Sequence, residues 1–121
     1  MTNRFVKADI WFHQDSDPGG GPEPYGWIRA YEPGTDKNKN YVEIWHKKNG
    51  DTLNHAYVEF VINISGEFKG INFYGDVKDS DTFSTDDVLA YPDTVSHGMP
   101  NELILIQGDE ADTYINIKYT I

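Results

Sequence analysis

The amino-acid sequence predicts an all-β fold, because apolar and polar residues alternate along much of the chain. The pattern is clearest over residues 56–64 and again over residues 113–121. Side chains of a strand point alternately to its two faces, so a period of two predicts strands with one buried and one solvated face. With seven or eight such strands and no strong helix, we expect a two-layer antiparallel β-sandwich, jelly-roll-like or Greek key. A partly open β-barrel is the alternative.

The chain has the size and composition of one globular domain. It has 121 residues, of which 38% are hydrophobic, and this is enough for a single sandwich core. No internal repeat, linker or change in composition divides it, so we expect one domain spanning residues 1–121.

The first two strands are expected at residues 4–13 and residues 25–31. Val6, Ala8, Ile10 and Phe12 share one face of the first segment. The stretch between the two segments, residues 15–24, is rich in Asp, Gly and Pro, which is typical of a turn.

Residues 41–74 are expected to form a three-stranded antiparallel meander. Asn49-Gly50 separates alternating runs at residues 41–46 and 53–64, and this dipeptide is preferred in type I′ hairpin turns. Ser65-Gly66 then separates the long run from residues 67–74, with glycine where a tight reversal requires it.

A closing pair of strands is expected at residues 102–107 and 113–121, joined through residues 108–110. The second of these is apolar up to its last residue, so we expect it to be tied into the sheet. The alternative is an edge strand that pairs with a second copy to form a homodimer. Residues 84–87 could cap a short helix, and a strand at residues 88–91 is the competing interpretation.

The charge of the chain is strongly acidic. The formal net charge is −10, and residues 61–121 carry −8 of it. Because phosphate binding needs clustered Lys and Arg, we expect no direct binding to nucleic acid. There is no cysteine, no signal-peptide pattern at the N-terminus and no stretch of about 20 apolar residues. We therefore expect no membrane span and a cytoplasmic protein by default, with release by a non-classical route as the alternative.

Clustered aspartates predict the candidate metal site. Carboxylates on loops are the ligands that Ca²⁺ prefers. The chain has two Asp-x-Asp segments, at residues 15–17 and 79–81, but neither has the spacing of an EF-hand. If a Ca²⁺ ion binds, the expected ligands are Asp76, Asp79, Asp81, Asp86 and Asp87.

No motif for catalysis is present. The four histidines lack zinc-ligand spacing, and no serine lies in a G-x-S-x-G segment. His46 is expected to point inward, and His46 and His55 flank the predicted hairpin turn, which would make them cross-strand neighbours. We expect a protein without enzymatic activity.

Aromatic residues predict the candidate binding surface. If the aliphatic faces are buried, the three tryptophans stand on outer faces beside tyrosines and charged residues. Such rings suit stacking on a sugar, and they suit a protein interface equally well. The expected ligand-binding residues are Trp27, Trp45, Tyr31, Tyr41, Asp15 and Asp17.

These features predict a non-enzymatic binding module. The first hypothesis is lectin-like carbohydrate binding, assisted by Ca²⁺ if the metal site exists. The alternative is an acidic inhibitor or decoy that imitates the charge of a nucleic acid and occupies a basic groove of a protein partner. A partner, whether a glycan or a protein, is expected in either case.

Overall fold

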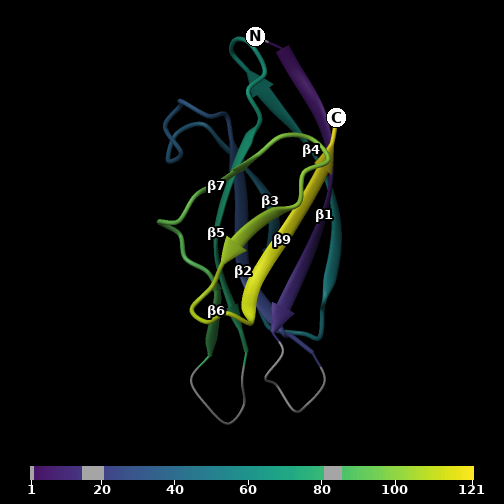
Figure 1. The fold of residues 1–121 in the computed structure, drawn as a ribbon, viewed down its shortest axis with the longest axis vertical. Helices are drawn as coiled ribbons and strands as arrows, with labels where there is room; N and C mark the ends of the chain where they lie inside the picture. Colours follow the sequence, from purple (N-terminus) through teal and green to yellow (C-terminus); the bar gives the residue numbers. More distant parts are fainter. Residues whose placement is uncertain (1, 15–20, 81–85) are drawn as a thin grey trace.

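The computed structural model describes residues 2–14, 21–80 and 86–121 and confirms the predicted antiparallel β-sandwich (Figure 1). Within these residues the strands are β1 (Thr2–Gln14), β2 (Pro24–Tyr31), β3 (Tyr41–Lys47), β4 (His55–Ile64), β5 (Ile71–Asp79), β6 (Asp87–Ala90), β7 (Ser96–Gly98), β8 (Ile104–Gln107) and β9 (Thr113–Thr120).

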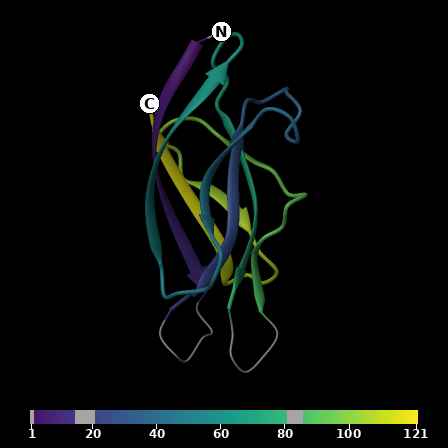
Figure 2. The same ribbon diagram turned by 180° about the vertical axis from the view of Figure 1, so that it is seen from behind.

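The strands form two sheets that pack face to face. Sheet A has the order β4-β1-β9-β8. Sheet B has the order β3-β2-β5-β6, and β7 also pairs with β5. The strands of both sheets run along the long axis of the molecule, and the two chain termini lie toward the same end (Figure 1; Figure 2).

The core fills the space between the sheets. Along β1 the burial alternates, with Val6, Ala8, Ile10 and Phe12 buried, as the period of two predicts. The largest fully buried core side chains come from both sheets: Phe12, Ile10, Ile64, Ile106, Ile115, Ile117 and Tyr119 from sheet A, and Ile28, Ile71, Phe73 and Leu89 from sheet B.

The C-terminal strand β9 lies inside sheet A, between β1 and β8. Its buried residues include Ile115, Ile117 and Tyr119, so this strand is tied into the sheet as predicted. Because β9 pairs with β1 on one side and β8 on the other, the alternative that residues 113–121 form an edge strand is wrong, and a homodimer stays a prediction.

The predicted meander over residues 41–74 is wrong. β3 belongs to sheet B and β4 to sheet A, while β5 returns to sheet B and pairs with β2. The residues around Asn49-Gly50 therefore connect two sheets instead of closing a hairpin. Leu53 N–H donates to the Pro22 carbonyl, and a Cβ on Gly50 would lie 2.5 Å from the Ser80 side chain. The alternation along β4 agrees with the prediction, but alternation cannot tell which sheet a strand joins.

The remaining elements match the sequence in part. β8 and β9 form the predicted hairpin. β6 confirms the strand interpretation near residues 88–91. The short strand β7 was missed, because its three residues include the small residue Gly98, packed against Ile104, and no apolar side chain.

Candidate functional site

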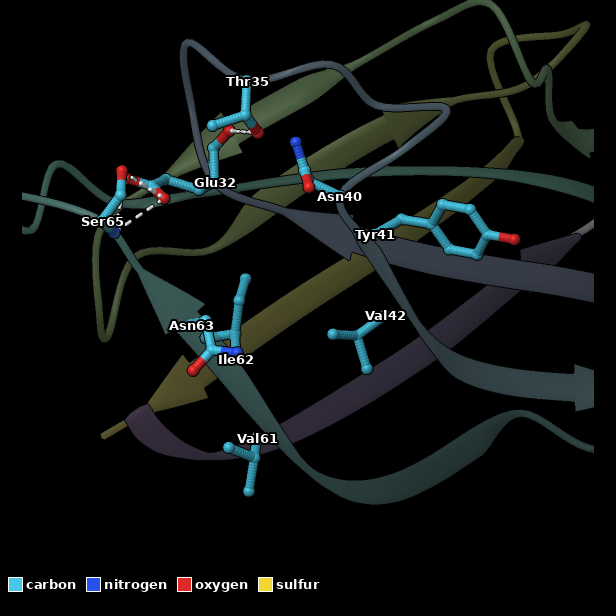
Figure 3. A pocket seen from close by; sticks show the side chains of 9 residues that line it. All are labelled: Glu32, Thr35, Asn40, Tyr41, Val42, Val61, Ile62, Asn63 and Ser65. Atoms are coloured by element: carbon cyan, nitrogen blue, oxygen red, sulfur yellow. Dashed lines mark hydrogen bonds between the residues drawn. The ribbon is translucent and has the colours of Figure 1, made fainter. Parts of the chain in front are cut away.

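A pocket of about 320 Å³ lies on one flank of the sandwich (Figure 3). Edge strand β3 of sheet B and edge strand β4 of sheet A border this flank, and these two strands are not paired with each other. The start of β3 supplies Tyr41 and Val42, and the end of β4 supplies Val61, Ile62 and Asn63. The pocket therefore sits where the two sheets open toward solvent.

A carboxylate joins the two sheets beside this pocket. Glu32, directly after β2, accepts hydrogen bonds from the Ser65 N–H at 2.9 Å and the Ser65 hydroxyl at 2.8 Å. The Thr35 hydroxyl donates to the Glu32 carbonyl at 2.7 Å and shapes the loop that follows β2. Figure 3 shows the carboxylate turned toward Ser65. These contacts hold one wall of the pocket in place.

Two amide side chains remain available in the pocket lining. Asn40 lies at the end of the loop before β3, and Asn63 lies near the end of β4. Neither side-chain amide makes a hydrogen bond to another described residue. Each amide offers two donors and an acceptor, so the pocket presents polar groups beside the apolar Val42 and Val61 side chains.

Tyr41 links this pocket to the outer face of sheet B. Its side chain is 40% exposed, and the Arg29 guanidinium lies 4.0 Å from its ring centroid. The same guanidinium lies 4.1 Å from the Trp27 ring and 3.8 Å from the Glu43 carboxylate. Arg29 thus joins two of the predicted ligand-binding rings, Trp27 and Tyr41, in one cation–π arrangement.

Tyr31 is not an exposed ligand-binding residue, contrary to the prediction. It is only 7% exposed and packs edge-on against Tyr74 on the outer face of sheet B. The Tyr74 hydroxyl donates to the Lys37 carbonyl at 2.8 Å, and Lys37 Nζ lies 5.0 Å from the Tyr74 ring. The loop at residues 32–40 therefore covers these rings, which strand alternation alone could not reveal.

Trp45 points toward the core, contrary to the prediction. Ile28 lies opposite Trp45 and Arg29 lies opposite Glu43, so Ile44 is an extra residue, as in a β-bulge. The bulge shifts the alternation of β3 by one position. Trp45 consequently packs against Phe12, with ring centroids 4.9 Å apart, and remains partly exposed at the rim of the core.

The same shift explains the exposure of His46, which was expected to point inward. His46 and His55 belong to different sheets and are not cross-strand neighbours. His55 instead contacts Asp9 at 2.8 Å on the outer face of sheet A.

Trp27 keeps the partly exposed position that the sequence predicts. It borders a hollow of about 100 Å³ together with Tyr25, Asp76 and Lys78. The Tyr25 hydroxyl donates to the Asp86 carboxylate, and this bond, with burial and the nearby negative charges, raises the pKa of Tyr25 to about 12.

The predicted calcium ligands are divided among separate contacts. Asp79 is buried and accepts a hydrogen bond from the Glu23 N–H at 2.6 Å. Asp87 accepts one from the Gln14 amide at 2.6 Å, while Asp86 contacts Tyr25. Asp76 borders the hollow beside Trp27. Within residues 2–14, 21–80 and 86–121, no group of three or more His, Asp or Glu side chains is arranged to hold a metal ion.

Three of the predicted site residues, Asp15, Asp17 and Asp81, lie outside the described residues. The prediction of a Ca²⁺ site that includes Asp81, and of ligand contacts from Asp15 and Asp17, therefore stays a prediction.

The flank itself was missed by the sequence analysis. Glu32, Asn40, Asn63 and Ser65 come from two distant segments, and no spacing in the sequence connects them. Only the packing of the sheets brings them together, so the sequence offered no signal for this pocket.

Comparison with known proteins places the fold in a family. No protein-family model and no curated protein matches the chain. The described part of the chain has no helix with the length and apolar character needed to cross a membrane. The chain is similar to a component of a solved structure, the crystal structure of the Cry23Aa1 and Cry37Aa1 binary protein complex. The two chains are 31% identical with a TM-score of 0.86, and the match covers 98% of this chain and 97% of that one. On this similarity, the chain belongs to the same family as that component of the Cry23Aa1–Cry37Aa1 complex.

Proposed function

We propose that this protein is a non-enzymatic, protein-binding subunit that works in a complex with a second, different protein. The observation that carries the proposal is the similarity, over nearly the full length of both chains, to a component of a binary protein complex. The match includes the arrangement of the whole sandwich and is not confined to one motif.

The charge of the chain supports a basic partner. The net charge of −10 would attract a positively charged protein surface and speed its association. Part of this charge gathers where the β8–β9 turn meets β6. There Asp112 and Asp109 of the turn and Asp87 of β6 raise the pKa of Glu110. Mutual repulsion within this group is relieved by a cationic partner, which favours a complex with a basic protein.

The direct test mixes the purified protein with the protein that accompanies its relative in the Cry23Aa1–Cry37Aa1 complex. Sedimentation velocity should show one faster species at the mass of a 1:1 complex. Two species that sediment independently at all concentrations would overturn the proposal.

The same experiment over a range of salt concentrations separates this proposal from the acidic decoy. A decoy that replaces phosphate contacts should lose affinity steeply as salt rises, since long-range charge attraction is screened. A subunit that uses its charge mainly to speed association, and whose affinity comes from apolar contacts and hydrogen bonds, should associate more slowly as salt rises but lose much less affinity than a decoy.

Carbohydrate binding is the second candidate function, and the flank pocket favours it. Its volume of about 320 Å³ lies at the lower end of the range for small-ligand sites. A sugar could contact the Tyr41 ring and bond to the free amides of Asn40 and Asn63. A glycan array, run with and without Ca²⁺, tests this function and the calcium prediction together. Binding that disappears in Asn63→Ala would support the pocket, and no binding in either condition would remove this candidate.

A further inference from the structure

β4 presents a long, regular strand edge. Ten consecutive Cα pairs, from Thr2–Ile64 to Trp11–His55, join it to β1 without a register shift. The Phe12 N–H bonds to the Asn54 carbonyl in the same register, which places the even-numbered residues of both strands in the hydrogen-bonded pairs. The peptide groups of Tyr57, Glu59, Val61 and Asn63 consequently point away from β1, and β4 pairs with no other described strand.

The other edges of the described sheets are shortened, bent or covered. β3 carries the bulge at Ile44 and ends in Lys47 followed by Lys48. β6 has only four residues. The Ser96 hydroxyl beside β8 donates to the Leu105 carbonyl at 2.7 Å. Bulges, short strands and lysines are features that keep sheet edges from pairing with other chains, and β4 has none of these three.

Several large apolar side chains along this edge are exposed, so a bound strand would remove apolar surface from water. Tyr57 is 54% exposed and Val61 is 48% exposed. Phe5, which lies opposite Val61 on β1, is 52% exposed. The flank pocket begins at Val61, so an added strand that passes Val61 would run directly beside the hollow between the sheets.

We propose that β4 accepts an extended segment of the partner protein as a fifth strand of sheet A. Backbone bonds to Tyr57, Glu59, Val61 and Asn63 would hold the segment, and the flank pocket would receive one of its side chains. This inference rests on the proposed function and names the surface through which the complex forms.

The occupant is a segment of a different protein and not a second copy of this chain. Two copies, each with a net charge of −10, repel one another. Antiparallel pairing of β4 with itself would also bring the Glu59 carboxylates close together near the centre of the edge, where like charges are destabilising. A partner strand with Lys or Arg opposite Glu59 would replace this repulsion with attraction. An apolar residue beside Val61 would cover the exposed Val61 side chain.

Val61→Pro tests the proposal, because proline removes the N–H that faces the free edge and leaves the bonds to β1 in place. Val61→Thr is the matched control, since it stays β-branched and retains the N–H. The probe is the protein that accompanies the relative of this chain in the Cry23Aa1–Cry37Aa1 complex. We expect the dissociation constant to rise at least about tenfold in Val61→Pro and to change less than about threefold in Val61→Thr.

A second measurement covers the case in which Val61→Pro fails to fold. In the wild-type complex, the amide hydrogens of Tyr57, Glu59, Val61 and Asn63 should gain protection from exchange. The strand-addition proposal is wrong if the complex forms, these amides gain no protection from exchange and Val61→Pro binds as tightly as the wild type. The subunit function stands in that case. A wild-type protein that does not bind the probe would overturn both.

Discussion

Ile28 of β2 lies opposite Trp45 of β3, and the bulge at Ile44 that creates this pairing turns the Trp45 ring onto Phe12. Trp27, only one residue before Ile28, lies on the other face of the same strand against the Arg29 guanidinium. The two tryptophans therefore have different roles, although both are partly exposed.

Trp45→Ala should destabilise the protein more than Trp27→Ala. Removing Trp45 leaves a cavity beside Phe12, which should cost about 2–4 kcal/mol of unfolding free energy. Removing Trp27 loses a cation–π contact with Arg29 and an edge contact with Tyr74, about 1 kcal/mol together. Urea unfolding of both variants checks this order, and a larger loss in Trp27→Ala would contradict the packing of Trp45 against the core.

Tyr119→Phe should lower the unfolding free energy by about 1–2 kcal/mol. The Tyr119 ring is fully buried, and its hydroxyl donates to the Gly98 carbonyl at 2.8 Å. Phenylalanine retains the ring but leaves this carbonyl without its partner. Thermal or urea unfolding measures the loss. A variant as stable as the wild type would show that solvent reaches Gly98.

Three glycine-to-alanine variants should fall in a definite order of stability. Gly66→Ala should change the unfolding free energy by less than about 0.5 kcal/mol, since its Cβ would enter open space. Gly34→Ala should cost about 1 kcal/mol, because φ is +86° and there is space for the Cβ. Gly26→Ala should cost about 3 kcal/mol or more, since φ is +125° and the Cβ would lie 1.9 Å from the Asp76 carbonyl oxygen. Equal losses at Gly26 and Gly34 would contradict the close packing of β2 against β5.

Tyr25 should make stability depend on pH at the alkaline end. Its pKa is about 12 in the folded protein and near 10 in an unfolded chain. Because the folded state favours the neutral phenol, this stabilisation is complete below pH 10 and is lost as the pH rises through about 12. Tyrosinate absorbance, compared between the wild type and Tyr25→Phe, isolates this group. Asp86→Ala should bring the pKa back toward 10, and a titration unchanged by Asp86→Ala would exclude the Asp86 bond as its cause.

The sequence predicted those features of the fold that depend on local alternation. Val6, Ala8, Ile10 and Phe12 share a buried face because each lies two residues from the next, and the hairpin of β8 and β9 follows from adjacent strands with a short turn. The assignment of β3 and β4 to one meander failed because alternation is the same whichever sheet a strand joins.

The candidate site was harder to predict for a related reason. The bulge at Ile44 reversed the face of Trp45, and the loop at residues 32–40 covered Tyr31. Neither the bulge nor the position of the loop can be recognised from the alternation of residues. Tyr41 and Trp27 were placed correctly on an outer face, because each belongs to a regular stretch of strand. The Glu32–Ser65 contact joins segments that are 33 residues apart and exists only once the two sheets pack together.

The central claim is that β4 is an open strand edge, and residue-resolved amide hydrogen exchange in the free protein tests it most directly. Along β4, the amides of Ala56, Val58, Phe60 and Ile62 bond to β1 and should exchange slowly, near the rate set by global unfolding. The amides of Tyr57, Glu59, Val61 and Asn63 face the open edge and should exchange orders of magnitude faster. An alternating pattern of slow and fast exchange is the predicted result. Uniform protection along β4 would contradict the account, because it would mean that the edge is already covered in the free protein.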